Sequence, residues 1–160
     1  MNRNNENEKK KRGEEVINQI KIKLPSLSVN ESLARSMISV FCAQADPSVN
    51  ELADIKCAVS EAVTNCIVHA YRDTVGEIYI TAKLILHANG DKSVRIEIAD
   101  RGCGIPDVEQ ARMPLYTTDA ANERSGMGFT VMESFCDKVK VRSRCGKGTT
   151  VVLHKRLCRR

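Results

Sequence analysis

The sequence predicts a single α/β domain, a two-layer sandwich with helices on one face of a mixed, mostly antiparallel sheet. Two segments with apolar residues at three- and four-residue spacing precede several segments in which apolar and polar residues alternate. The turn Asn89-Gly90-Asp91 joins two alternating segments, which favours antiparallel pairing. The chain has 160 residues, enough for one domain with a substantial core.

The composition is ordinary for a soluble domain, with 42% hydrophobic and 28% charged residues. No apolar run reaches the roughly eighteen residues that cross a bilayer, and residues 1–13 lack the apolar segment of a secretory signal. We therefore expect a cytoplasmic protein with no membrane contact. The seven cysteines show no Cys-x-x-Cys spacing, which indicates reduced thiols rather than a zinc or redox site.

The N-terminal segment, residues 1–15, is rich in Asn, Lys and Glu, which predicts a flexible charged tail before a domain spanning residues 16–158. In residues 20–24 apolar residues alternate with lysines, and this pattern predicts an edge strand that ends at Pro25.

The first helix is expected to begin with a capping box formed by Ser28 and Glu31. Its periodicity assigns inward positions to Leu33, Met37, Ile38 and Phe41, and outward positions to Ser32, Arg35, Ser36 and Ser39.

The long second helix, residues 49–71, has a start signal in Pro47, Ser48 and Glu51. Glu61 and Asn65 stand four residues apart and share one helix face. A carboxylate can take a proton from an attacking hydroxyl, and an amide oxygen can help hold a divalent cation, although such a pair alone is typical of a solvated face. A core stripe is expected on the opposite side, at Leu52, Ile55, Val59, Val63, Cys66, Ile67 and Ala70.

Four further strands are predicted by alternation at residues 78–86, 93–99, 138–144 and 149–157.

Two glycine-rich segments lie in the second half of the chain. Residues 100–106 follow a strand, and residues 124–129 open a short apolar helix that reaches about Phe135. Between them we expect a short helix at residues 107–112 and then a polar loop, residues 113–125, whose length is typical of a lid or binding loop.

The C-terminal part is basic, since residues 138–160 contain nine Lys or Arg and no Asp or Glu. Such a patch could meet nucleic acid. However, Lys138, Lys140 and Arg142 alternate with valines and have no aromatic neighbours for base stacking. The pattern favours a solvated face or an acidic protein partner, without direct nucleic-acid binding.

The order of the Glu61–Asn65 helix and the two glycine segments resembles the N, G1 and G2 boxes of the superfamily that includes gyrase, Hsp90, histidine kinases and MutL, which implies a Bergerat-type ATP-binding fold. Residues 20–157 further resemble the anti-sigma F family of spore-forming bacteria, on the strings at residues 30–32, 60–65, 69–71, 114–118, 123–132 and 148–150.

This resemblance implies a homodimeric serine kinase that uses ATP and Mg²⁺, binds and inhibits a sporulation sigma factor, and phosphorylates a serine on an anti-anti-sigma protein. The alternative is a nucleotide-dependent anti-sigma protein without phosphotransfer. A gyrase- or MutL-type ATPase and a histidine kinase are disfavoured, since we find neither transducer segments nor a phosphoacceptor helix.

The resemblance also assigns roles to residues: Glu61 is the general base, Asn65 is a Mg²⁺ ligand, and Asp100 accepts a hydrogen bond from the adenine amine. Nucleotide contacts are expected at His69, Gly102, Gly104, Thr117, Thr118, Arg124, Ser125, Gly126, Met127, Gly128 and Thr149.

Chemistry supports several of these roles. Gly102 and Gly104 would let backbone approach the base, and Gly126 and Gly128 would expose amides to phosphate at a helix start. Arg124 would reach the terminal phosphate.

Five further residues have roles that are open or that lie outside the nucleotide site. Thr149 or Thr150 would complete the adenine pocket, and His69 is either a second contact to the site or a structural hydrogen-bonding residue. Cys103 is a packing or spacer residue, or else redox-active. Arg35 is expected to bind the sigma factor from an accessible position remote from all three boxes.

Overall fold

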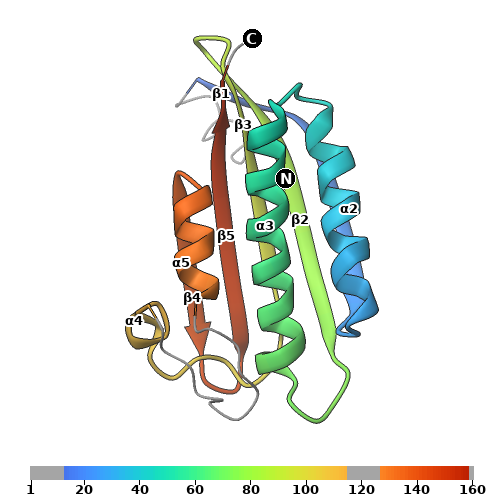
Figure 1. The fold of residues 1–160 in the computed structure, drawn as a ribbon, viewed down its shortest axis with the longest axis vertical. Helices are drawn as coiled ribbons and strands as arrows, with labels where there is room; N and C mark the ends of the chain where they lie inside the picture. The colour runs from blue at the N-terminus through green and yellow to red at the C-terminus, as the bar shows by residue number, and fades with distance from the viewer. Residues whose placement is uncertain (1–12, 115–126, 159–160) are drawn as a thin grey trace, which may run out of the picture.

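The computed structural model describes residues 13–114 and 127–158. They form two layers, a five-stranded sheet and a layer of helices on one of its faces (Figure 1). The strand order is β1-β2-β3-β5-β4. The strands are β1 (Glu14–Pro25), β2 (Glu77–His87), β3 (Lys92–Ala99), β4 (Lys138–Arg144) and β5 (Gly148–Leu157).

The helices are α2 (Val29–Ala43), α3 (Val49–Asn65), α4 (Val108–Ala111) and α5 (Gly128–Phe135), and a π-helical turn, η2 (Cys66–Ala70), directly continues α3. Among the described residues, no helix is long and apolar enough to cross a membrane.

The predicted two-layer α/β class is confirmed, and every pairing between the described strands is antiparallel. Hairpins reverse the chain between β2 and β3 and between β4 and β5, while α2 and α3 return it between β1 and β2. The core lies between the sheet and the helices. It buries Ile38 of α2, Ile55, Val59 and Val63 of α3, Met132 of α5, and Ile80 and Ile98 of the sheet.

Strand β1 is longer than the alternation at residues 20–24 predicts, and it includes Glu14 and Glu15, which we assigned to the tail. Residues 14–19 are exposed, so hydrogen bonds to β2 rather than burial hold this part of the strand. A backbone ladder leaves no periodic apolar signal, which is why the sequence pattern does not reveal it.

Helix α2 differs from the expectation in its cap and in its buried face. Ser28 is the N-cap residue but makes no side-chain capping bond. The inward prediction for Leu33 and the outward prediction for Ser39 are both wrong, since Leu33 is 46% exposed and Ser39 is buried. Because α2 contacts both α3 and the sheet, its buried stripe is centred on the smaller Ala34 and on Ile38.

Helix α3 begins as predicted. Ser48 N donates to Glu51 Oε2 at 2.7 Å and Glu51 N donates to Ser48 Oγ at 3.2 Å, which completes the capping box. The expected continuous helix to residue 71 instead changes to π geometry after Asn65. Such changes often occur at functional sites.

Candidate functional site

Glu61 and Asn65 lie where α3 ends, and the start of α5 lies directly over them. A Cβ atom at Gly128 would be 3.2 Å from Glu61 Oε2 and 3.4 Å from both Oδ1 and Nδ2 of Asn65. The structure thus brings the second glycine segment against the carboxylate and amide that the sequence singles out. Glycine at this position lets a helix start, with its free amides, approach the pair closely.

Asp100 follows β3 and is buried. Its Oδ1 accepts hydrogen bonds from Gly102 N at 2.9 Å and Thr149 N at 3.2 Å, and its Oδ2 lies 3.7 Å from the Cys66 thiol. Burial raises the pKa of Asp100, and the hydrogen bonds from Gly102, Thr149 and Cys66 oppose that shift in part. The expected adenine acceptor is therefore held rigidly by backbone amides. Cys66 is a contact that its place on the apolar stripe does not reveal.

The glycines of the first segment pack against protein backbone. A Cβ atom at Gly102 would lie 2.1 Å from Ala70 O, and one at Gly104 would lie 2.2 Å from Arg144 O. Gly148, which lies in one of the strings that carry the resemblance but was assigned no role, has a φ of +88°, and its Cβ would meet Asp100 O at 2.1 Å. These glycines join the segment to η2 on one side and to the β4–β5 turn on the other. Their contact with a base stays a prediction.

The hydroxyl of Thr149 lies 2.8 Å from Ser143 Oγ, which accepts a hydrogen bond from Ile105 N at 2.7 Å. Ser143 is a second residue that the sequence did not indicate, and a strand serine carries no signal of such a role. These bonds fix the first glycine segment against the end of β4.

Cys103 contacts backbone on the η2 side. Its amide donates to Ala70 O at 2.9 Å and its thiol donates to His69 O at 3.2 Å. The contacts favour the packing interpretation of Cys103 over the redox one. They involve the carbonyl of His69, so the role of the imidazole stays a prediction.

The residues expected to contact phosphate from the long loop, Thr117, Thr118, Arg124, Ser125 and Gly126, lie outside the described residues. Met127 is the N-cap of α5, and its carbonyl accepts from Val131 N at 2.8 Å.

Two ion pairs help to hold the part of α5 that lies away from Gly128. Arg112 pairs with Glu133 at 2.6 Å, which ties α5 to the chain after α4. Lys155 donates to Phe135 O at 2.7 Å and to Asp54 at 2.8 Å, so it links the last turn of α5 to α3.

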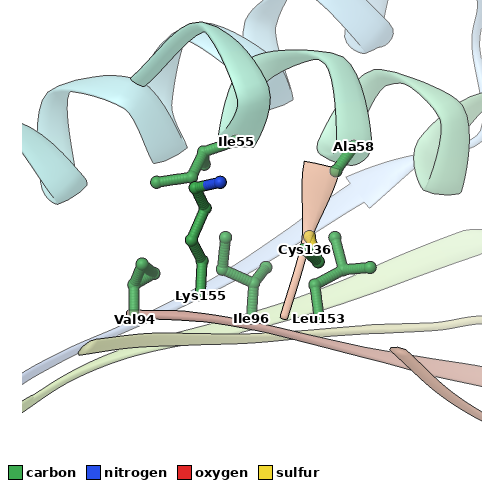
Figure 2. Close-up of a pocket in the computed structure, with 7 residues that line it drawn as sticks. All are labelled: Ile55, Ala58, Val94, Ile96, Cys136, Leu153 and Lys155. Atoms are coloured by element: carbon green, nitrogen blue, oxygen red, sulfur yellow. The ribbon is translucent and has the colours of Figure 1, made fainter. Parts of the chain in front are cut away.

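The space around Lys155 is a feature of packing. Figure 2 shows an apolar gap between α3 and the sheet, without room for a water molecule. Its lining residues are Ile55, Ala58, Val94, Ile96, Cys136, Leu153 and Lys155.

Arg35 is half-exposed, with its Nε 3.8 Å from Glu31 Oε1 and its side chain 3.3 Å from Ser32 Oγ. The same Glu31 oxygen accepts a hydrogen bond from Ser60 Oγ. One carboxylate therefore connects Arg35 to the residue before Glu61, and the expectation that Arg35 is remote from the boxes stays a prediction. Spacing along α2 could not reveal this contact, which depends on how α2 packs against α3.

The chain belongs to the histidine kinase-like ATPase domain family, whose model matches residues 24–155. Within this class, the chain belongs to the anti-sigma F factor family.

The chain is 50% identical over 141 residues to an anti-sigma F factor of Caldanaerobacter subterraneus, covering 88% of this chain and 95% of that protein. It is 49% identical over 143 residues to one of Shouchella clausii, covering 89% and 94%.

A solved structure shares the fold. The RsbU and RsbW domains of a Mycobacterium tuberculosis protein superimpose with a TM-score of 0.62 at 23% identity. The match covers 89% of this chain but only 33% of the solved one.

Proposed function

We propose that this protein is an anti-sigma factor and an ATP-dependent protein serine kinase. It binds and inhibits a sporulation sigma factor, and it transfers phosphate from ATP to a serine of an anti-anti-sigma protein. The family membership supports the anti-sigma role. The observation that carries the kinase proposal is the approach of Gly128 to Glu61 and Asn65, at 3.2 and 3.4 Å from the position of a Cβ.

This geometry supports a base acting beside a phosphate-binding element. The amides at the start of α5 would bind the terminal phosphate, because a helix start presents unpaired N–H groups. Glu61 would take the proton from the partner's serine hydroxyl while the serine oxygen bonds to the γ-phosphorus. The bond between that phosphorus and its bridging oxygen breaks, and ADP leaves.

The residues present fit a magnesium ion. Asn65 offers its Oδ1 at the end of α3, close to the amides of α5, and a hard cation prefers such oxygen ligands. When bound there with ATP, Mg²⁺ would neutralise phosphate charge. Asp100, fixed by Gly102 and Thr149, would accept from the exocyclic amine of adenine, where guanine has a carbonyl.

The partner surface includes Arg35, which is half-exposed on α2. An arginine that is already oriented by a carboxylate loses less side-chain freedom on binding. We expect the protein to act as a homodimer, which size-exclusion chromatography with light scattering would test.

The deciding experiment is incubation of the full chain with γ-labelled ATP and a candidate anti-anti-sigma protein. We expect label on a serine of the partner, and a 10²- to 10⁴-fold slower transfer by Glu61→Gln with nucleotide still bound. Glu109→Gln, at an exposed position on α4, is the matched control.

The alternative is a protein that binds nucleotide and sigma factor without phosphotransfer. Sigma capture with no label on any partner serine would support that alternative. Normal transfer by Glu61→Gln would remove the base role from Glu61 and leave the kinase assignment standing.

A further inference from the structure

The sheet face opposite the helices is strongly basic at both edges. Lys21 and Lys23 of β1 are exposed, as are Lys138, Lys140 and Arg142 of β4. All five side chains lie on the same face of the sheet. Along each strand they alternate with apolar residues that face the helices, and the strand pairing keeps this alternation in step across the sheet. No described helix covers this face (Figure 1).

Positively charged side chains also lie on the middle strands of this face. Lys83 of β2 lies directly opposite Arg95 of β3, and Arg95 lies opposite His154 of β5. Three carboxylates of the described strands lie on this face. Glu77 pairs with Lys23 at 2.5 Å, Glu14 lies 3.7 Å from His87, and Glu97 lies 4.0 Å from Arg95 and 3.7 Å from Arg142. They are fewer than the cations on the same face, so the face keeps an excess of positive charge; these cations are Lys21, Lys23, Lys83, Arg95, Lys138, Lys140 and Arg142.

This arrangement costs folding stability rather than adding to it. Like charges directly opposite each other on neighbouring strands are destabilising, and the Lys83–Arg95 pair is such a case. Binding of an anionic partner would relieve the repulsion.

We propose that this sheet face docks an acidic segment of a protein partner. The segment's Asp and Glu side chains pair with the rows of Lys and Arg across the open face. Strand neighbours are about 4.8 Å apart and same-face residues about 6.7 Å apart, so carboxylates on an extended or helical segment can meet several cations at once. The surface lies on the side of the sheet away from Glu61 and Arg35, so it is separate from the kinase site.

The aromatic content of the face favours a polypeptide over nucleic acid. Tyr79 is the only Phe, Tyr or Trp in the five described strands. Its ring lies 4.8 Å from the Arg101 guanidinium and 5.8 Å from Lys23 Nζ, and its hydroxyl donates to Glu77. The ring is therefore already occupied, and base stacking on this face has no free platform.

Fluorescence anisotropy of the full chain with labelled poly-L-glutamate, and separately with labelled duplex and single-stranded DNA, tests the proposal. We expect poly-L-glutamate binding that weakens steeply as salt rises. The double variant Lys138→Gln, Lys140→Gln should bind poly-L-glutamate about tenfold more weakly. Glu97→Gln should bind it about two- to threefold more tightly, a gain that misfolding cannot produce.

The matched control is Lys56→Gln, Lys92→Gln, which removes the same charge from the outside of α3 and from the helix-facing side of β3. It should retain binding within about twofold. Equal loss in both double variants would overturn the proposal by reducing the effect to net charge. Tighter binding of either DNA than of poly-L-glutamate, lost in the β4 variant, would overturn it in favour of a nucleic-acid surface.

Discussion

Ser60 Oγ donates a hydrogen bond to Glu31 Oε1, and this bond joins α3, one residue before Glu61, to α2, four residues before Arg35. Glu31 also pairs with Arg35 at 3.8 Å. A single carboxylate therefore lies between the proposed sigma-binding residue and the helix that carries the proposed base. Movement of Arg35 on partner binding would change the charge facing Glu31, and with it the strength of the Ser60 bond.

Ser60→Ala should destabilise the protein by about 1.5 to 3 kcal/mol, the range for a hydrogen bond to a charged group. Urea unfolding would measure the loss. Ser60→Thr keeps a hydroxyl and should lose less. Equal unfolding midpoints for wild type and Ser60→Ala would show that the bond contributes nothing.

Arg35→Ala should weaken sigma-factor binding by at least about 1 kcal/mol. ATP affinity should stay within about twofold, because Arg35 is connected to the helix of Glu61 only indirectly, through Glu31 and Ser60. Pull-down and nucleotide titration on the same variant would measure both. Undiminished capture of the sigma factor by Arg35→Ala, or a parallel loss of ATP binding, would contradict this prediction.

Gly128→Ala should impair both nucleotide binding and phosphotransfer. The added Cβ would lie 3.2 Å from Glu61 Oε2, so α5 or the Glu61 side chain must shift away from the arrangement described. A misplacement of about 1 Å can reduce transfer by about 10²-fold, and a smaller shift should reduce it by less. Calorimetry with ATP and the labelled transfer assay would measure the two effects.

Gly146→Asn is the control for Gly128→Ala, since a Cβ there meets nothing within 4 Å and asparagine tolerates its φ of +69°. Normal transfer by Gly128→Ala would show that the close approach is not required.

Asp100→Asn should reduce ATP affinity by about 1.5 to 3 kcal/mol, because a neutral amide replaces a charged acceptor. GTP should bind far more weakly than ATP to the wild type. Equal affinity for GTP would contradict the proposed adenine contact.

The same substitution should change stability with pH. Burial raises the folded-state pKa of Asp100, so its contribution favours folding below the ordinary carboxyl pKa and is lost as pH rises through the folded-state value. Asparagine does not titrate and can still accept from Gly102 and Thr149. The thermal unfolding midpoint of Asp100→Asn should therefore rise relative to that of the wild type between pH 4 and pH 7. A constant difference over that range would show that Asp100 does not behave as a buried carboxylate.

Local signals in the sequence predicted the helices and strands, but they did not predict the contacts between them. The capping box of Ser48 and Glu51 and the turn at Gly90 depend on adjacent residues, and both are present. Glu31 has the right spacing to cap α2, but the neighbouring α3 supplies Ser60 instead. Spacing within one helix carries no information on which side chain a second helix will present.

The glycines also show that a local sequence signal does not identify which part of the fold a residue contacts. Gly102 was expected to make room for a base, and its missing side chain makes room for Ala70 O. A glycine signals that something approaches closely, and only the fold tells what it is.

The position of β1 bears on how the chain folds. Its one partner among the described strands is β2, and both α2 and α3 lie between them along the chain, whereas the β2–β3 and β4–β5 hairpins close locally. Loop closure makes the distant pairing slow relative to a hairpin. The β3–β5 pairing joins residues that are about as far apart along the chain, so we expect both pairings to form after the hairpins. Because residues 14–19 of β1 are exposed at a sheet edge, hydrogen exchange should be fast in this part of the strand. Strand β1 leads into α2, which carries Arg35, so this edge adjoins the helix proposed to meet the sigma factor.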